Sequence, residues 1–123
     1  STEQGFRVVP AEECWYKSLT PLMAEVREKL GDGPVYLSFD IDGIDPAFAP
    51  GTGTAEIGGL TSTQGIEIIR GMRGLDVVGG DLVEVSPPYD PFGNTSVLAA
   101  NLLFEMLCIL PGVRYDDKVK AVY

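Results

Sequence analysis

The sequence predicts an α/β fold in which helices cover a mainly parallel sheet. Three apolar stretches with the composition of buried strands alternate with three stretches of helical periodicity, in the order strand, helix, strand, helix, strand, helix. Connections that carry a helix between consecutive strands make those strands parallel and place the helices against the sheet. The 123 residues are enough for one domain but few for a complete α/β enzyme.

The three predicted strands are short and apolar. They comprise residues 5–9 (GFRVV), 35–39 (VYLSF) and 77–85 (VVGGDLVEV). Glycine, proline and aspartate flank the last two strands and mark their ends. Gly79 and Gly80 would weaken a strand unless another part of the chain packs closely against its backbone, so we expect such a contact there.

The three predicted helices differ in how much of their surface is apolar. In residues 18–30 apolar side chains recur every three or four positions, and Gly31 is placed to end the helix. Thr61 precedes a second amphipathic pattern. Its apolar positions are Ile66, Ile69 and Met72. Asn94 is a suitable N-cap for a third helix, in which residues 97–110 are apolar nearly all round, as in a helix that lies beneath another subunit or within a larger core.

The composition argues against several classes of partner. Lys and Arg number 9 against 18 Asp and Glu, a formal net charge of −9, whereas nucleic-acid binding requires a basic surface. No apolar run approaches the ~20 residues that cross a bilayer, and the first residues lack the features of a signal peptide. We therefore expect neither nucleic acid nor membrane as a partner. Two cysteines are too few for a disulfide framework, which favours a reducing, intracellular compartment.

The segment with the clearest chemical meaning is residues 38–56, SFDIDGIDPAFAPGTGTAE. If the strand continues through it, Asp40 and Asp42 project to the same side about 7 Å apart, beyond the carboxyl end of a parallel strand, where α/β sheets bind ligands. Two such carboxylates repel each other unless a cation or a proton joins them, and a pair of divalent ions is one solution. Alternatively, Asp40, Asp42 and Asp45 are turn and cap residues that begin a long loop. The residues alone leave both interpretations open.

Several motifs resemble those of one enzyme family. SFDIDGIDP followed by APGTGTAE resembles the last metal-binding motif of the ureohydrolases, whose members include arginase, agmatinase and formiminoglutamase. The opening GFRVVPAEECW, then GGLTSTQGIEIIR and DLVEVSPPYDPFGNTSVLAANLLFEML, are more similar to agmatinase than to arginase. The resemblance covers nearly the whole chain. It implies a three-layer α-β-α fold with a mainly parallel sheet, of which residues 1–123 are a partial domain, the carboxyl-terminal part of a single ureohydrolase domain.

The resemblance also assigns roles to individual residues. It implies that Asp40 bridges two manganese ions, that Asp42 binds one of them, and that Asp45 shapes the loop without being a ligand. Glu84 matches the glutamate that receives the guanidinium group of the substrate. In an apolar strand an unpaired Glu84 would be costly, and a guanidinium offers it two parallel hydrogen bonds. The alternative for Glu84 is a structural ion pair with an arginine elsewhere, and Asp81, on the opposite face, is a weaker candidate for a supporting role.

The chain also departs from the family pattern. The family takes its remaining ligands from a GGDHS-like and a DAHxD-like motif, both upstream, and this sequence contains neither motif and no histidine. Ala55 stands where a proline is common after GTGT, and Tyr16 stands where agmatinase-like chains commonly have histidine after CW. We therefore expect the 123-residue chain alone to lack part of the metal site.

The function implied by the resemblance is manganese-dependent hydrolysis of a guanidino compound to urea and an amine. Agmatine, which yields putrescine, is the first candidate substrate, and guanidinobutyrate or another ω-guanidino compound is the second. The resemblance further implies a homo-oligomer located in the cytoplasm or the mitochondrial matrix. A different interpretation is a noncatalytic fragment or pseudoenzyme that acts through subunit association, because ligands are missing and residues 97–110 form a long apolar helix.

Overall fold

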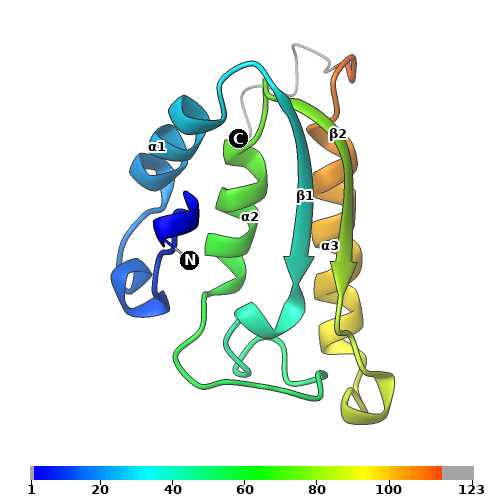
Figure 1. Cartoon of the computed structure of the whole chain (residues 1–123). Helices are drawn as coiled ribbons and strands as arrows, with labels where there is room; N and C mark the ends of the chain where they lie inside the picture. Colours follow the sequence, from blue (N-terminus) through cyan, green and yellow to red (C-terminus); the bar gives the residue numbers. More distant parts are fainter. Residues whose placement is uncertain (1, 115–123) are drawn as a thin grey trace.

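Two neighbouring parallel strands form the centre of the structure. The computed structural model describes residues 2–114 (Figure 1). Its strands are β1 (Pro34–Asp40) and β2 (Asp76–Val83), and its helices are α1 (Thr20–Leu30), α2 (Ser62–Gly71) and α3 (Asn94–Cys108). Four short 3₁₀ helices accompany them, at Thr2–Gln4, Ala11–Cys14, Ile41–Gly43 and Pro87–Tyr89. A parallel sheet with helices between and after its strands confirms the predicted α/β class, here as a partial domain.

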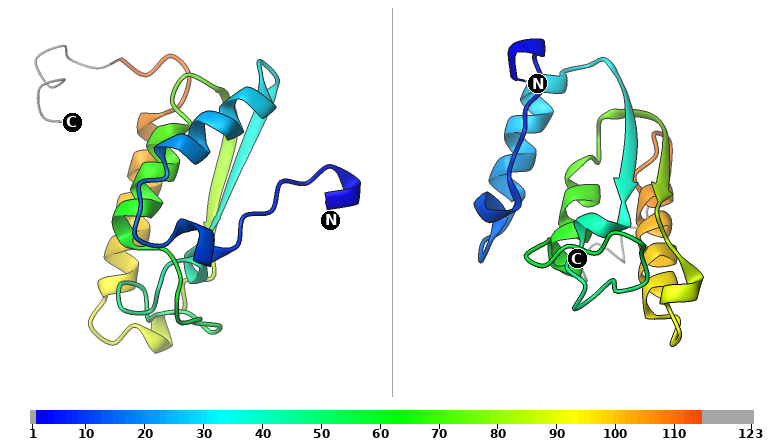
Figure 2. Two further views of the ribbon diagram at one scale, coloured as in Figure 1. Left: turned by 90° about the vertical axis from the view of Figure 1, so that its left-hand side faces the viewer. Right: turned by 60° about the horizontal axis from the view of Figure 1, so that its bottom comes forward.

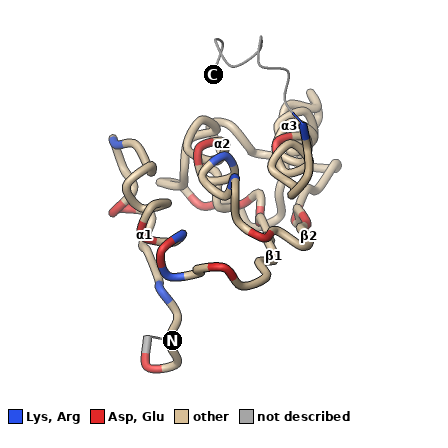
Figure 3. The backbone as a smooth tube through the Cα atoms, turned by 90° about the horizontal axis from the view of Figure 1, so that it is seen from above, with Lys and Arg blue, Asp and Glu red and all other residues tan. Residues whose placement is uncertain are grey.

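The helices lie together on one side of the sheet. Figures 2 and 3 show α2 and α3 against the same face of β1 and β2, with α1 packed beyond α2. The core lies between this helical layer and the strands. Its buried side chains include Val35, Phe39, Ile69, Val77, Leu102 and Met106. The other face of the sheet is open in the described part of the chain, where Tyr36 remains 61% and Val78 63% exposed.

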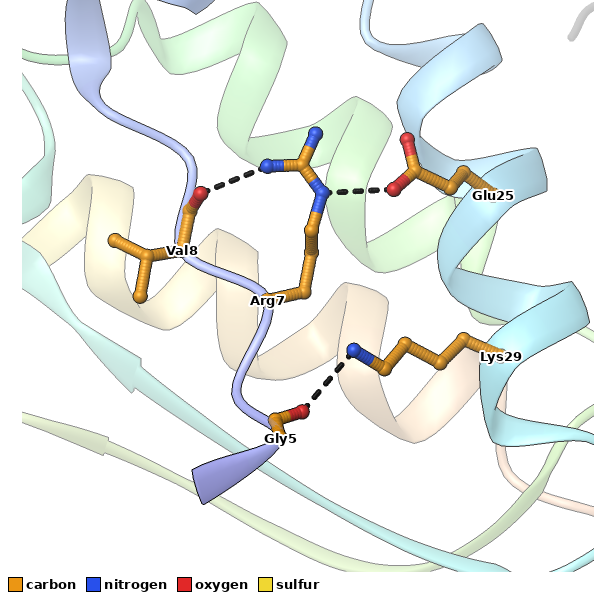
Figure 4. Close-up of polar contacts among 5 residues, drawn as sticks. All are labelled: Gly5, Arg7, Val8, Glu25 and Lys29. Carbon is orange, nitrogen blue, oxygen red and sulfur yellow. Dashed lines mark hydrogen bonds and ion pairs between the residues drawn. The ribbon is translucent and has the colours of Figure 1, made fainter. Parts of the chain in front are cut away.

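The predicted first strand, residues 5–9, is wrong. These residues have no regular secondary structure and lie beside α1 (Figure 4). Arg7 Nε donates to Glu25 Oε1 at 2.7 Å, and Lys29 Nζ donates to the carbonyl of Gly5 at 3.1 Å. A strand needs a neighbour for its backbone hydrogen bonds, and among residues 2–114 the sheet consists of β1 and β2 alone. The apolar composition of the segment was therefore insufficient to make it a strand.

The ends of α1 and α2 follow their predicted signals. Thr61 caps α2 with a complete capping box, in which its hydroxyl accepts from the Gln64 amide at 3.1 Å and Gln64 Oε1 accepts from the Thr61 amide at 3.0 Å. Gly31 ends α1 at a φ of 60°, and its amide donates to the carbonyl of Arg27. These two caps fix where the chain leaves each helix and enters the connections to the strands.

The start of α3 differs from the prediction. Asn94 is the first residue of the helix and not its cap, and it follows Gly93 in the left-handed conformation. The buried carboxylate of Asp90 does the capping instead, because it accepts from the amides of Thr95 and Ser96 at 3.0 and 2.9 Å. A negative charge at this end also interacts favourably with the helix dipole.

The outer surface of α3 is as apolar as the sequence suggested. One face of the helix is buried against the core, whereas Val97, Phe104 and Leu107 remain 72%, 62% and 61% exposed. Within residues 2–114 no helix has both the length and the apolar character needed to traverse a bilayer. Both cysteines are free, Cys14 being buried and Cys108 half-buried, as expected of a chain without a disulfide framework.

The two glycines of β2 make the close contacts that the sequence predicts. A Cβ atom at Gly79 would lie 3.0 Å from the ring of Tyr36, and one at Gly80 would lie 2.9 Å from the carbonyl oxygen of Leu37. The strands pair with a register shift between Val35 and Tyr36. Beyond that shift the pairing is regular up to Asp40 opposite Val83, where both strands end.

Candidate functional site

The three predicted site residues meet at the carboxyl end of the sheet. β1 ends at Asp40 and β2 ends at Val83, its partner in the register, so Glu84 follows directly beside Asp40. Asp42 lies two residues beyond the end of β1. This edge is where open parallel sheets bind ligands. The topology therefore brings together three carboxylates, although Asp40 and Glu84 are 44 positions apart in the chain.

The local geometry of the aspartate pair differs from the prediction. Asp42 does not continue the strand, because the chain turns after Asp40 into the 3₁₀ helix Ile41–Gly43. Asp40 caps that helix, with Oδ1 accepting from the amide of Asp42 at 3.1 Å. The two side chains are thus neighbours through a tight turn and not through the alternation of a strand. The capping role of Asp40 and a role in binding a cation are compatible, since a carboxylate has two oxygens.

The electrostatics of Asp40 are those of a crowded carboxylate. Although the residue is exposed as a whole, partial desolvation of its carboxylate raises its pKa above the ordinary value. The negative charges of Asp42 and Glu84 raise the pKa of Asp40 further, against the opposing effect of the hydrogen bond from the Asp42 amide. Like charges held together disfavour ionisation, and a bound cation would relieve that repulsion.

A residue of the loop that follows the 3₁₀ helix Ile41–Gly43 contacts the side chain of Asp42. The hydroxyl of Thr54 donates to Asp42 Oδ2 at 2.6 Å. Asp42 is half-buried, whereas Thr54 is exposed. No sequence pattern indicated that Thr54 contacts Asp42, although Thr54 lies within residues 38–56.

Glu84 adopts an unusual backbone conformation. The predicted strand extended to residue 85, but β2 ends at Val83 and Glu84 has a φ of 69°. A non-glycine residue in the left-handed region costs roughly 1–3 kcal/mol, and such residues gather at functional sites. Glu84 is also exposed among residues 2–114, so the burial predicted for it is not seen in the described part of the chain. Its place beside Asp40 is what supports a functional role.

Asp45 organises the loop that follows the aspartate pair. Its two carboxylate oxygens accept from the amides of Ala47 and Gly58, each at 2.8 Å. These backbone hydrogen bonds lower the pKa of Asp45, Ala47 having the larger effect. The indole of Trp15 donates to the carbonyl of Gly58 at 2.8 Å and braces the same turn. Asp45 thus shapes the loop, as the family resemblance implied.

Gly51 joins this loop to the segment after Glu84. Its amide donates to the hydroxyl of Thr95 at 2.8 Å, and its carbonyl accepts from the amide of Ser86 at 2.8 Å. A Cβ atom at Gly51 would lie 2.6 Å from Cβ of Asp90 and 2.8 Å from Oγ1 of Thr95. Only glycine fits this junction without displacement. This junction was not predicted, and the first glycine of the PGTG segment is its one visible signal in the sequence.

Asp81 binds the two strands together on the open face of the sheet. It accepts hydrogen bonds from the hydroxyls of Tyr36 and Ser38, both at 2.7 Å. The bond from Ser38, followed by that from Tyr36, lowers the pKa of Asp81. Both carboxylate oxygens of Asp81 are therefore engaged with β1, which indicates a structural contact between the strands.

The residues present fit part of a manganese site. Carboxylate oxygens are suitable ligands for Mn²⁺, and the mutual repulsion around Asp40 is what a divalent ion would relieve. Residues 2–114 nevertheless contain no group of three or more His, Cys, Asp or Glu side chains arranged to hold a metal ion. The described chain thus supplies an aspartate pair, and further ligands would have to come from elsewhere.

Comparison with known proteins identifies the family. A family model described as the arginase family matches residues 1–108. A guanidinobutyrase from Pseudomonas aeruginosa is 79% identical over 92% of this chain and 35% of its own length. A mitochondrial agmatinase from Gallus gallus is 73% identical over 91% of this chain and 33% of its own length. The solved structure of the proclavaminate amidino hydrolase from Streptomyces clavuligerus, 46% identical, superposes with a TM-score of 0.82 over 86% of this chain and 35% of that one.

The chain matches these relatives closely in sequence but covers only part of each of them. The chain spans about a third of the length of the curated relatives that it matches. The family model nevertheless covers most of the sequence, and the solved structure shares its fold. The match to the family model and the shared α/β architecture lead to one conclusion: the chain belongs to the arginase family.

Proposed function

We propose that this chain is the carboxyl-terminal part of a protein that hydrolyses an ω-guanidino compound to urea and an amine with the help of two manganese ions. The observation that carries the proposal is the convergence of Asp40, Asp42 and Glu84 at the carboxyl ends of two adjacent parallel strands. Ligands that the chain lacks, histidine among them, would come from the remainder of the protein.

Each of the three residues would have a distinct task. Asp40 and Asp42 would hold the metal pair, which supplies a nucleophile by lowering the pKa of water towards neutrality. Glu84 would accept two parallel hydrogen bonds from the guanidinium and fix its carbon within reach of that water. One water adds to the guanidinium carbon, the bond from that carbon to the substituted nitrogen breaks, and the nitrogen leaves as a protonated amine. Guanidinium and water thus become urea and an ammonium ion, in balance.

The substrate is expected to be a short ω-guanidino compound. The guanidinobutyrase relative is more similar to this chain than the agmatinase relative, 79% against 73% identity. We therefore place guanidinobutyrate before agmatine, which reverses the order suggested by the sequence motifs alone. Urea release from each of the two compounds, measured on the whole protein under the same conditions, distinguishes them by the ratio of their kcat/KM values.

The proposed division of labour can be tested with two substitutions in the whole protein. Asp42→Asn preserves size but removes the charge, and it should lower manganese content while the fold is retained. Glu84→Gln should leave manganese content near that of the unsubstituted protein. It should reduce kcat/KM about thirtyfold or more, the lower end of what removing one partner of a charged hydrogen-bonded pair costs. Full metal content and turnover in Asp42→Asn, or loss of manganese with unchanged kinetics in Glu84→Gln, would contradict these assignments.

A noncatalytic protein that acts through subunit association is the second candidate. It is favoured by the apolar outer surface of α3, where Val97, Phe104 and Leu107 are exposed. The same surface would also serve a homo-oligomeric enzyme. Absence of urea release from a panel of guanidino compounds by the manganese-loaded whole protein would favour this candidate over the hydrolase.

A further inference from the structure

We propose that Thr54 is a positioning residue that fixes the carboxylate of Asp42 for metal binding, an inference that rests on the proposed function. The hydroxyl of Thr54 reaches across the loop to Asp42 Oδ2 at 2.6 Å. Hydroxyl-to-carboxylate hydrogen bonds of 2.5–2.7 Å are charge-assisted and among the stronger ones in proteins. This contact is therefore strong enough to restrain an otherwise rotatable side chain.

The restraint matters because a carboxylate can present either oxygen to a cation. Asp42 follows the end of β1 and lies in a single 3₁₀ turn, so within residues 2–114 no neighbouring strand orders its side chain. Engagement of Oδ2 by Thr54 sets the plane of the carboxylate and leaves the other oxygen for a metal ion. Hydrogen bonds to metal-binding carboxylates from outside the coordination shell orient the ligand, and their loss typically weakens metal binding about tenfold to a hundredfold.

Thr54 can act in this way only if its own loop is fixed, and Gly51 fixes it. The Gly51 amide donates to the hydroxyl of Thr95, and the Gly51 carbonyl accepts from the amide of Ser86, both at 2.8 Å. Thr95 is fully buried at the start of α3. The position of the exposed Thr54 hydroxyl is thus tied, three residues away, to a buried helix terminus.

Three substitutions in the whole protein separate this role from a general effect on the loop. Thr54→Val removes the hydroxyl but keeps the shape of the side chain, whereas Thr54→Ser keeps the hydroxyl and removes the methyl group. Thr52→Val is the matched control, because the Thr52 hydroxyl is buried without a hydrogen-bond partner in the described part of the chain. The readouts are manganese affinity by competition titration with a chelator, the Tm of the metal-free protein, and kcat and KM for urea release.

The expected result is specific to the hydroxyl of Thr54. Thr54→Val should bind manganese about tenfold to a hundredfold more weakly with an unchanged metal-free Tm, whereas Thr54→Ser and Thr52→Val should bind it like the unsubstituted protein. Because Thr54 contacts a proposed metal ligand, saturating manganese should bring the kcat of Thr54→Val back towards that of the unsubstituted protein. Any change in KM should be reversed to a smaller extent.

Other outcomes would overturn the inference in distinguishable ways. If the unsubstituted protein binds manganese and Thr54→Val binds it equally well, Thr54 has no positioning role while the proposed function stands. Equal losses in Thr54→Val and Thr52→Val, a parallel fall in the metal-free Tm, or no rescue by Thr54→Ser would show a structural role of the loop instead. An unsubstituted protein that neither binds manganese nor releases urea removes both proposals.

Discussion

Replacing Gly51 by alanine should be far more damaging than the same replacement two residues later. The added Cβ would lie 2.6 Å from Cβ of Asp90 and 2.8 and 2.9 Å from Oγ1 and Cβ of Thr95. Overpacking of this kind costs about 1–3 kcal/mol. If the chain moves to relieve it, the hydrogen bonds of Gly51 with the buried Thr95 and the half-buried Ser86 are lost, at about 1–3 kcal/mol for each buried group left unpaired. Alanine gains only about 0.4–1 kcal/mol through the unfolded state.

The net destabilisation expected for Gly51→Ala is about 2 kcal/mol or more. Gly53→Ala is the control, because a Cβ atom there would have no neighbour within 4 Å in the described structure. The free energy of unfolding of the metal-free whole protein should be measured for both variants, since bound metal would add its own stabilisation. Equal stability of the two variants would refute the assignment of Gly51 as a tightly packed junction.

Two further predictions concern acid stability and the isolated chain. Although partial burial opposes it, hydrogen bonds from Leu19, Ser18 and Thr20 hold the pKa of Glu67 below its ordinary value of 4.5. A depressed pKa stabilises the folded state above that ordinary value, and this stabilisation is lost as the pH falls through the folded pKa. Unfolding midpoints followed from neutral pH to below 4.5 should therefore fall less steeply in Glu67→Gln than in the unsubstituted protein, and identical slopes would contradict this. The purified 123-residue chain should release no urea from agmatine or guanidinobutyrate in excess manganese, because an aspartate pair alone is an incomplete site; steady turnover by a monomeric chain would disprove that account.

The α/β class was predictable because local signals and tertiary packing agree over most of the chain. Thr61 and Gln64 form the capping box that their spacing suggests, and β1 coincides with its predicted apolar run. Residues 5–9 have a similar apolar composition but no neighbouring strand within the described residues, so they lie along α1 instead. Composition reports which residues can enter a sheet, whereas a partner strand decides whether they do.

The candidate site was predictable in its location but not in its geometry. Asp40 and Asp42 lie at the end of a strand as expected, yet a tight turn places them there. The sequence LVEV continues a strand pattern through Glu84, and no local signal marks the change to positive φ. Long-range contacts such as that of Thr54 with Asp42 depend on how the loop returns, which residue periodicity does not encode.

The backbone conformation of Glu84 implies a conflict between stability and activity at this position. At a φ of 69° glycine would be accommodated without the steric penalty that a glutamate incurs. Selection for thermal stability alone would therefore favour glycine at position 84, whereas selection for the proposed hydrolysis would retain the carboxylate. A laboratory search for heat-resistant variants that does not also screen for urea release should be expected to recover glycine there, and with it a more stable protein without the carboxylate proposed to hold the substrate.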